Sequence, residues 1–232
     1  MRLAHPALDF AVEFRENRVP VLICENRAFF RKMITDLTVQ QEGEAGEFVL
    51  SDRWEPIPIS KHMLVVTDYY HPELNPKKAI SQLYRELARL AEDEYHHLQT
   101  GEARTALAEW AAELCANVDA PLTYEAEPDA AALLKALDVR FDGGDGDNLQ
   151  ALERLMRISA GFLKTDIMAL ALPHEHFNAE ELTLLYRTAH YNKLFLICLE
   201  TEVPRSKLEG EAWYIIDRDM CTVYNENERE TL

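Results

Sequence analysis

Five short stretches of the chain are apolar at almost every position. They are VPVLICE (19–25), KHMLVVTD (61–68), TDIMALAL (165–172), KLFLICLE (193–200) and AWYIIDRD (212–219). Strands that are covered on both faces have such continuous apolar sequences, whereas half-exposed strands alternate between apolar and polar residues. The pattern therefore predicts an α/β fold with a mostly parallel sheet. The segment RLAHPALDFAVEF (2–14) has a shorter, interrupted pattern, which predicts an antiparallel hairpin at an edge.

The interval between the second and third apolar stretches, residues 76–164, has helical periodicity and is too long for one crossover connection. We predict an inserted helical domain there, between two parts of a head domain, 1–75 and 165–232. Two apolar stripes at helical spacing are expected to pack two helices along their faces. The first stripe consists of Ile80, Leu83, Tyr84, Leu87, Leu90 and Ala91, and the second of Ala103, Leu107, Trp110, Ala111 and Leu114.

Two more helices have recognisable N-terminal signals. Asp147 is a suitable N-cap for a helix over 148–162. Asn178 is a suitable N-cap for a helix over 178–191, and Glu181 three residues later completes the sequence pattern of a capping box. The polar stretch at 225–232 is expected to be a frayed tail.

The overall charge limits the partners that the protein can bind. The chain has 232 residues and a formal net charge of −17, so its general surface repels nucleic acid and anionic membranes. Any DNA contact must therefore be local. No signal peptide or bilayer-spanning stretch is present, which predicts a cytoplasmic protein that does not bind membranes. Four widely spaced cysteines predict reduced core residues rather than disulfides or a zinc site: Cys24, Cys115, Cys198 and Cys221.

The stretch PVLICENRAFFRKM (20–33) leads from a strand directly into a helix, which is the layout of a phosphate-binding loop. Such a loop needs glycines, whose backbone N–H groups surround the phosphate, and a lysine that meets its charge. Here the junction is Glu25-Asn26-Arg27, with neither glycine nor lysine. The sequence therefore predicts that the chain hydrolyses no nucleotide.

The order of VLICENRAFF, HMLVVTD, PLTYEAEPDAAALLKALDVRFD and KLFLICLE resembles the Csn family, the small accessory proteins of type II-A CRISPR adaptation modules. The most distinctive parts are the pair Glu25-Asn26 and the segment 124–142. The resemblance implies a head like a degenerate P-loop nucleotide hydrolase, with an inserted helical leg, assembled as a homotetrameric ring that calcium stabilises. It also implies a non-enzymatic protein that binds double-stranded DNA ends without sequence preference. Members assist spacer acquisition, an antiviral defence function, alongside the CRISPR integrase and the effector nuclease. The acidic, glycine-rich stretch DGGDGD (142–147) departs from the family pattern.

A group of acidic residues is the first candidate metal site: Asp119, Glu125, Glu127 and Asp129. Calcium takes six to eight oxygen ligands and tolerates irregular geometry. No EF-hand spacing is present, so the residues by themselves favour a solvated acidic turn, whereas the family resemblance favours calcium. A second acidic group, Asp142, Asp145 and Asp147, is interpreted as a solvated loop.

A basic line is the candidate DNA-binding surface. Lys78, Gln82, Arg85 and Arg89 follow helical spacing opposite the first apolar stripe. One interpretation is an ordinary solvated face, in which Arg89 pairs with Asp93. The other is a phosphate contact, because Arg85 and Arg89 repel each other across one turn unless an anion lies between them. Further basic residues rank lower because acidic neighbours such as Asp138, Asp142 and Glu153 neutralise several of them: Lys135, Arg140, Arg154, Arg157 and Lys164.

The remaining residues give no sign of catalysis. The pair His96-His97 and the triplet His174-Glu175-His176 lack the H-E-x-x-H spacing of a metal site, so we predict surface histidines. No serine or cysteine lies in a nucleophile motif, and no catalytic residue is predicted. The alternative function is a metal-dependent nuclease that uses the carboxylates near Asp119 and Glu125 on DNA.

Overall fold

The computed structural model describes residues 1–225. The predicted tail at 225–232 therefore lies outside the described residues except for Asn225, which ends a strand. The chain divides into two compact units, which we call the sheet unit (1–74 and from 143 onward) and the helical unit (75–142). The predicted insertion extended to 164. Residues 143–164 instead belong to the sheet unit, because α6 (Asn148–Ile158) packs against α8 (Ala179–Tyr191).

The sheet unit contains a six-stranded sheet in the order β10-β9-β3-β8-β7-β6. All neighbouring strands are parallel except β9 and β10, which are antiparallel. Each of the five apolar stretches forms one of the parallel strands, which confirms the predicted α/β fold with a mostly parallel sheet. These five strands are β3 (Val19–Cys24), β6 (Met63–Val66), β7 (Ile167–Ala171), β8 (Phe195–Glu200) and β9 (Glu211–Ile216). The sixth, β10 (Thr222–Asn225), is the antiparallel edge strand.

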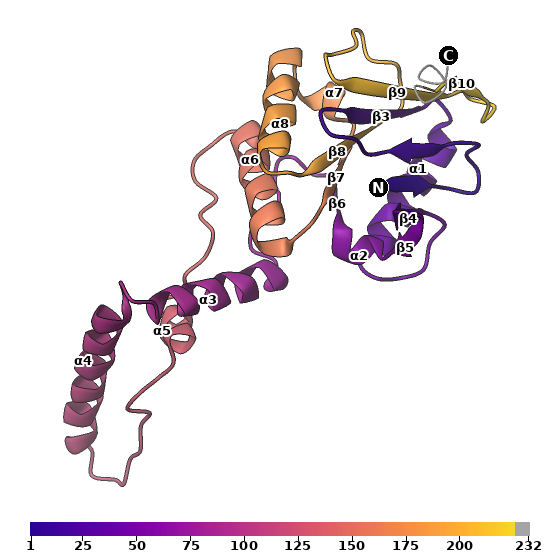
Figure 1. Cartoon of the computed structure of the whole chain (residues 1–232). Coiled ribbons are helices and arrows are strands. Elements are labelled where there is room, and N and C mark those ends of the chain that lie inside the picture. The colour runs from indigo at the N-terminus through magenta and orange to yellow at the C-terminus, as the bar shows by residue number, and fades with distance from the viewer. Residues whose placement is uncertain (226–232) are drawn as a thin grey trace. The chain divides into compact units, whose positions relative to one another are not determined.

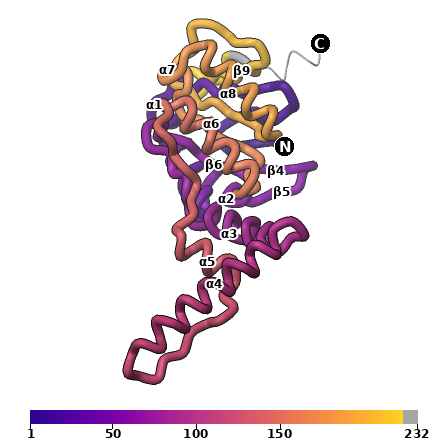
Figure 2. Tube along the Cα trace, turned by 90° about the vertical axis from the view of Figure 1, so that its left-hand side faces the viewer, coloured from indigo at the N-terminus to yellow at the C-terminus, as the bar shows by residue number. Residues whose placement is uncertain are grey.

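Both faces of this sheet are covered, which explains why its strands are apolar throughout. Leu22 and Cys24 of β3 belong to the larger core, together with Met33 of α1 (Arg27–Gln41). Val21 and Ile23 point to the opposite face, where Tyr186 of α8 packs against their cluster. In the sheet unit, α6 and α8 lie side by side on one face and α1 lies on the other (Figure 1, Figure 2).

A second, antiparallel sheet of the order β2-β1-β4-β5 completes the larger core. Its strands are β1 (Arg2–Ala4), β2 (Ala11–Glu13), β4 (Val49–Asp52) and β5 (Glu55–Ile57). The antiparallel hairpin over 2–14 is thereby confirmed, but it lies in this separate sheet because β1 pairs with β4 instead of with the parallel sheet. Two short helices, α2 (Ile59–His62) and α7 (Pro173–His176), precede and follow strands of the parallel sheet.

The predicted helix starts in the sheet unit are confirmed. Asp147 caps α6 by accepting a hydrogen bond from the Gln150 amide, and a π-helical turn (Ser159–Leu163) continues the helix. Asn178 and Glu181 form a complete capping box at the start of α8. All four cysteines are free, and Cys24 and Cys198 are buried as predicted. The prediction of core residues was wrong for the other two, because Cys115 is half-buried and Cys221 is exposed.

The helical unit consists of α3 (Lys77–Ala91), α4 (His97–Ala116) and α5 (Ala130–Ala136). The first apolar stripe packs α3 against α5, and Ala79 and Leu83 are buried. The second stripe was expected to pack as well. That expectation was wrong for the single chain, because α4 has no buried residue and Leu107, Trp110 and Leu114 are 40%, 60% and 50% exposed.

Candidate functional sites

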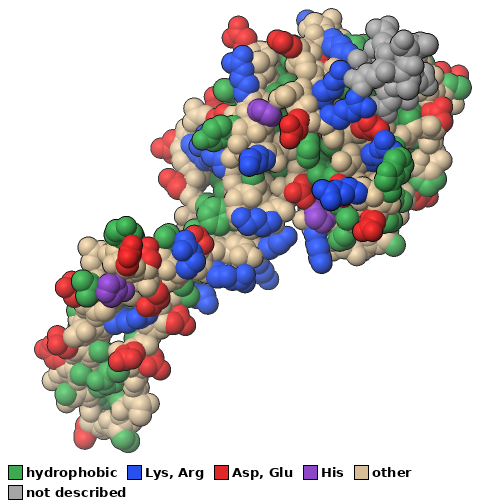
Figure 3. Space-filling view, viewed as in Figure 1, with side chains coloured by type: hydrophobic (Ala, Val, Ile, Leu, Met, Phe, Trp, Pro, Cys, Tyr) green, Lys and Arg blue, Asp and Glu red, His purple; other side chains and the backbone are tan. Residues whose placement is uncertain are grey.

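The three charged residues of the basic line on α3 are exposed as predicted, whereas Gln82 is half-buried. Lys78, Arg85 and Arg89 lie opposite the buried side of the helix. Lysine and arginine side chains are gathered along α3 in the space-filling view (Figure 3). Within residues 1–225 Arg85 makes no ion pair. The exposed face therefore provides cationic groups that are accessible to an anionic ligand.

Arg89 has an acidic partner, although it differs from the predicted one. Its Nη2 lies 2.7 Å from Oε1 of Glu86, one turn earlier on the helix, whereas Asp93 was expected. The hydrogen bond to Glu86 raises the pKa of Arg89 above its usual range. Because both side chains are exposed and screened by water, this pair contributes little to stability, and a phosphate group can displace Glu86 at little cost.

The two other predicted DNA contacts differ in their availability. Lys135 on α5 lies with Nζ 6.0 Å from the ring centre of Tyr84 on α3, so the α3–α5 packing brings this lysine close to α3. Arg140 forms an ion pair with Asp138 (2.7 Å), and this hydrogen bond raises its pKa. The expected neutralisation by Asp138 is confirmed, and it makes Arg140 the weaker candidate of the two.

The predicted acidic metal ligands do not converge in the single chain. Asp129 is the N-cap of α5 and accepts a hydrogen bond from the Ala132 amide (2.6 Å), and Glu125 accepts one from the Glu127 amide (3.2 Å). Both acids and Asp119 are exposed. Among the described residues, ligand atoms of three or more acidic, histidine or cysteine side chains come together only elsewhere in the chain.

The strand–helix junction at 25–27 uses its polar groups within the protein. The Glu25 amide donates a hydrogen bond to the Ile216 carbonyl (3.0 Å), which leaves it unavailable for a phosphate. Asn26 caps α1 by accepting from the Phe29 amide (3.0 Å), and its Nδ2 donates to the Arg218 carbonyl (2.8 Å). A phosphate-binding loop would direct such amides at its ligand. The junction therefore has the layout of such a loop, but its Glu25 amide and its Asn26 side chain are used within the protein.

Comparison with known proteins identifies the family. The family model described as CRISPR-associated protein (Cas_Csn2) matches residues 40–220. The chain belongs to this family. The resemblance noted in the sequence is thereby confirmed, and the protein is CRISPR-associated. No curated protein matches the chain.

Two solved structures are among those similar to this Csn2-family chain. One is MJ1267, an ATP-binding cassette of an ABC transporter, with 11% identity, a TM-score of 0.48, and coverage of 99% of this chain and 93% of that one. The other is a putative ABC transporter ATP-binding protein from Pyrococcus furiosus, with 12% identity, a TM-score of 0.39, and coverage of 92% and 97%. These TM-scores are too low to establish a shared fold.

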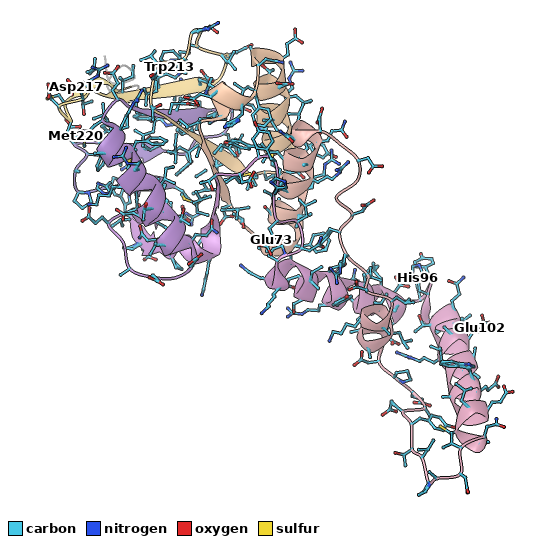
Figure 4. All side chains as sticks on the ribbon, turned by 180° about the vertical axis from the view of Figure 1, so that it is seen from behind. Glu73, His96, Glu102, Trp213, Asp217 and Met220 are labelled. Atoms are coloured by element: carbon cyan, nitrogen blue, oxygen red, sulfur yellow. The ribbon has the colours of Figure 1, made fainter. Side chains whose placement is uncertain are left out.

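The Csn2-family chain also contains a buried charge cluster that the sequence analysis missed. His174 was predicted to be a surface residue, but its side chain is only 11% exposed. Its Nδ1 lies 2.6 Å from Oε1 of Glu200 and its Nε2 lies 2.9 Å from Oε1 of Glu211. Tyr186 and Trp213 each donate a hydrogen bond to Glu211, and Figure 4 labels Trp213 on β9.

The charges of this cluster compensate one another. Burial lowers the pKa of His174, but the hydrogen bonds to Glu200 and Glu211 outweigh burial and raise its pKa to about 9. Burial raises the pKa of Glu211, but its hydrogen bonds, first to His174, leave it below its usual range. The sequence did contain a signal, because a glutamate within each of two buried strands needs a compensating partner. His96 at the start of α4, by contrast, is exposed as predicted (Figure 4).

Membrane insertion through a helix finds no support in the structure. Within residues 1–225, no helix combines the length and the apolar character that crossing a bilayer requires.

Proposed function

We propose that this Csn2-family protein is a non-enzymatic binder of double-stranded DNA ends that assists spacer acquisition in a type II-A CRISPR system. In this proposal four copies form a ring that calcium stabilises, in the cytoplasm, with the CRISPR integrase and the effector nuclease as partners. The observation that carries the proposal is the exposed basic face of α3, formed by Lys78, Arg85 and Arg89, in a chain of net charge −17.

The charge distribution favours a channel over an open surface. A net charge of −17 per copy repels DNA from most of the protein, so the attraction must come from a few basic groups. Ring symmetry would place copies of the α3 face around one axis. The local density of Lys and Arg would then exceed that of any single chain. DNA binding in this proposal requires assembly.

The exposed apolar face of α4 supports assembly. Leu107, Trp110 and Leu114 follow each other at helical spacing and remain exposed in the single chain. Apolar residues continue past the helix at Val118 and Leu122, which are 50% and 48% exposed. Contiguous exposed apolar surface marks interaction sites. We propose that a second copy of the chain covers this face, and that the helical unit serves as the leg of the assembly.

Calcium in this proposal is bound at the segment that follows α4. Asp119, Glu125, Glu127 and Asp129 supply carboxylate oxygens there, and all four are exposed. Because they do not converge within one chain, water or a neighbouring copy must complete the six to eight ligands that calcium takes. An ion bound in this way would hold copies together.

The sheet unit in this proposal is a degenerate relative of the P-loop nucleotide hydrolases. The β3–α1 junction supports this view, because it retains the strand–helix layout while the Glu25 amide and the Asn26 side chain are used internally. The unit would then act as a scaffold for assembly and not as a catalyst.

The decisive experiment compares linear with covalently closed circular duplex DNA of the same sequence. Each is incubated with the purified protein in calcium and in chelator, and a second series contains magnesium or manganese. A ring predicts a mobility shift with linear DNA in calcium, little binding to closed circles, and intact DNA throughout. Equal binding to both topologies would contradict the ring. DNA fragments in magnesium or manganese would indicate the alternative, a metal-dependent nuclease.

A further inference from the structure

A buried histidine in the sheet unit faces two carboxylates. His5 lies in the turn after β1, and its side chain is fully buried. The ring is enclosed by Phe29 (centroid distance 5.1 Å) and Phe48 (4.7 Å). Its Nε2 makes no hydrogen bond and points to the carboxylates of Asp36 on α1 and of Glu47, which precedes β4.

The three side chains have the spacing of metal ligands. Nε2 of His5 lies 3.2 Å from Oε2 of Glu47 and 3.9 Å from Oδ2 of Asp36, and all three atoms lie within 4.8 Å of one another. Ligands at bonds of about 2.0–2.1 Å in a tetrahedral zinc site are about 3.3 Å apart. Oδ2 of Asp36 is also buried without a hydrogen-bond partner. Two buried polar atoms thus face a common point that a cation would satisfy.

We propose that His5, Asp36 and Glu47 form a binding site for a divalent transition-metal ion, with zinc as the best fit. One imidazole nitrogen and two carboxylate oxygens suit zinc, and a water molecule would take the fourth position. Calcium does not fit this set, because it takes oxygen ligands in larger number. Glu47 and Asp36 are 50% and 20% exposed, so the ion can enter from solvent.

The local charge also favours a cation. Asp36 and Glu47 contribute two negative charges, and Lys32, one turn before Asp36 on α1, contributes one positive charge. Its Nζ lies 2.5 Å from the same Oε2 of Glu47 that faces His5. One negative charge remains uncompensated when His5 is neutral. Lys32 therefore competes with the ion for Glu47, and its removal should strengthen metal binding.

The proton on the imidazole must move when the ion binds. The Ala7 amide donates a hydrogen bond to Nδ1 of His5 (3.1 Å), so the proton of the neutral ring lies on Nε2. Metal binding at Nε2 transfers this proton to Nδ1 and releases the Ala7 amide. Ala7 is exposed, and its amide can then donate to water. The exchange loses the Ala7 hydrogen bond and turns the buried Nδ1 from an acceptor into a donor, and it gains three metal–ligand bonds.

An ion at this position would connect three segments of the sheet unit: the turn after β1, α1, and the residues before β4. This role concerns the folding of the sheet unit and does not depend on the proposed DNA binding.

The test is a zinc titration of the chelator-treated full-length protein, measured in competition with a zinc-binding dye. The visible absorption of bound cobalt(II) gives a second readout of tetrahedral geometry. We expect one ion per chain. The zinc affinity should fall ~10-fold or more in Asp36→Asn and in Glu47→Gln, because each change alters a metal ligand. It should rise in Lys32→Met. His5→Gln should abolish the cobalt spectrum. If that variant does not fold, the zinc affinities of Asp36→Asn and Glu47→Gln test the proposal, because both of these side chains are partly exposed.

His96→Gln and Cys221→Ser are matched controls, because both remove an exposed metal-binding side chain outside the site. They should bind zinc as the unmodified protein does. The proposal is overturned if the unmodified protein binds no stoichiometric zinc, if Asp36→Asn and Glu47→Gln retain its affinity, or if only the control variants lose binding.

Discussion

Nε2 of His174 lies 2.9 Å from Oε1 of Glu211, although 37 positions separate the two residues in the chain. The other imidazole nitrogen binds Glu200, so one charged ring joins α7 to β8 and β9. Both glutamates are buried. An unpaired buried carboxylate is strongly unfavourable, so the arrangement depends on the charge of His174.

The charge on His174 should make stability depend on pH. Its pKa is raised from 6.5 to about 9 by folding, so its contribution is fully present below about pH 6.5 and is lost as pH rises through about 9. Replacing it by glutamine should destabilise the protein by about 3–5 kcal/mol at pH 6.5, as expected for a broken buried pair, and should flatten the pH profile. Urea unfolding at pH 6.5 and 9.5 measures both effects. His96→Gln is the control, and an unchanged profile in His174→Gln would contradict the assignment.

The α3 face should determine DNA affinity. The double change Arg85→Ala with Arg89→Ala should weaken binding about equally on all sequences and reduce the dependence on salt, because phosphate contacts release counterions. Arg27→Ala with Arg31→Ala is a matched control, since it removes two exposed arginines of the same spacing from α1. Mobility-shift titrations at several salt concentrations compare the variants. Equal losses in both would show that only total charge matters.

The apolar face of α4 should hold copies of the chain together. Trp110→Glu places a charge in the centre of this face and should shift the assembly toward monomers, because an interface cannot bury an unpaired carboxylate without cost. Sedimentation velocity measures the distribution. Tyr191→Glu, on the exposed surface of α8, is the control. An unchanged distribution in Trp110→Glu would place the interface elsewhere.

Calcium should raise the melting temperature and favour the oligomer. A ligand that binds only the folded assembly stabilises it by about 2.7 kcal/mol at a hundredfold excess over its dissociation constant. Glu125→Gln combined with Glu127→Gln should abolish the calcium effect while leaving stability in chelator unchanged, because both side chains are exposed. Differential scanning calorimetry in calcium and in chelator measures the difference. Identical curves for the unmodified protein would remove calcium from the proposal.

Nucleotide hydrolysis should be absent. The β3–α1 junction has a carboxylate at Glu25 and no glycine, and the Glu25 amide already donates to the Ile216 carbonyl, so the junction would repel a triphosphate. Steady-state assays with ATP and GTP should show no turnover above background. Turnover that disappears in Glu25→Ala or Arg27→Ala would show that the junction is catalytic.

Features that depend on neighbouring residues could be predicted from the sequence. The five apolar runs became parallel strands because a strand that is covered on both faces needs apolar side chains at every position. The start of α8 was predictable for a similar reason, since Asn178 and Glu181 satisfy each other's backbone amides within one turn. Such signals require no knowledge of distant contacts.

Other features were decided only by the tertiary structure. An apolar stripe shows that one face of a helix must be covered, but it does not identify the element that covers it. For this reason α6 was predicted in the wrong unit, and α4 was predicted to pack on a neighbouring helix although it has no buried residue in the single chain. The burial of His174 was missed for the same reason, because its partners Glu200 and Glu211 are contributed by the distant strands β8 and β9. His5, Asp36 and Glu47 come together only because β1 pairs with β4 beside α1. Sequence patterns determine which surfaces must be buried, whereas the order of strands in space determines which polar groups meet.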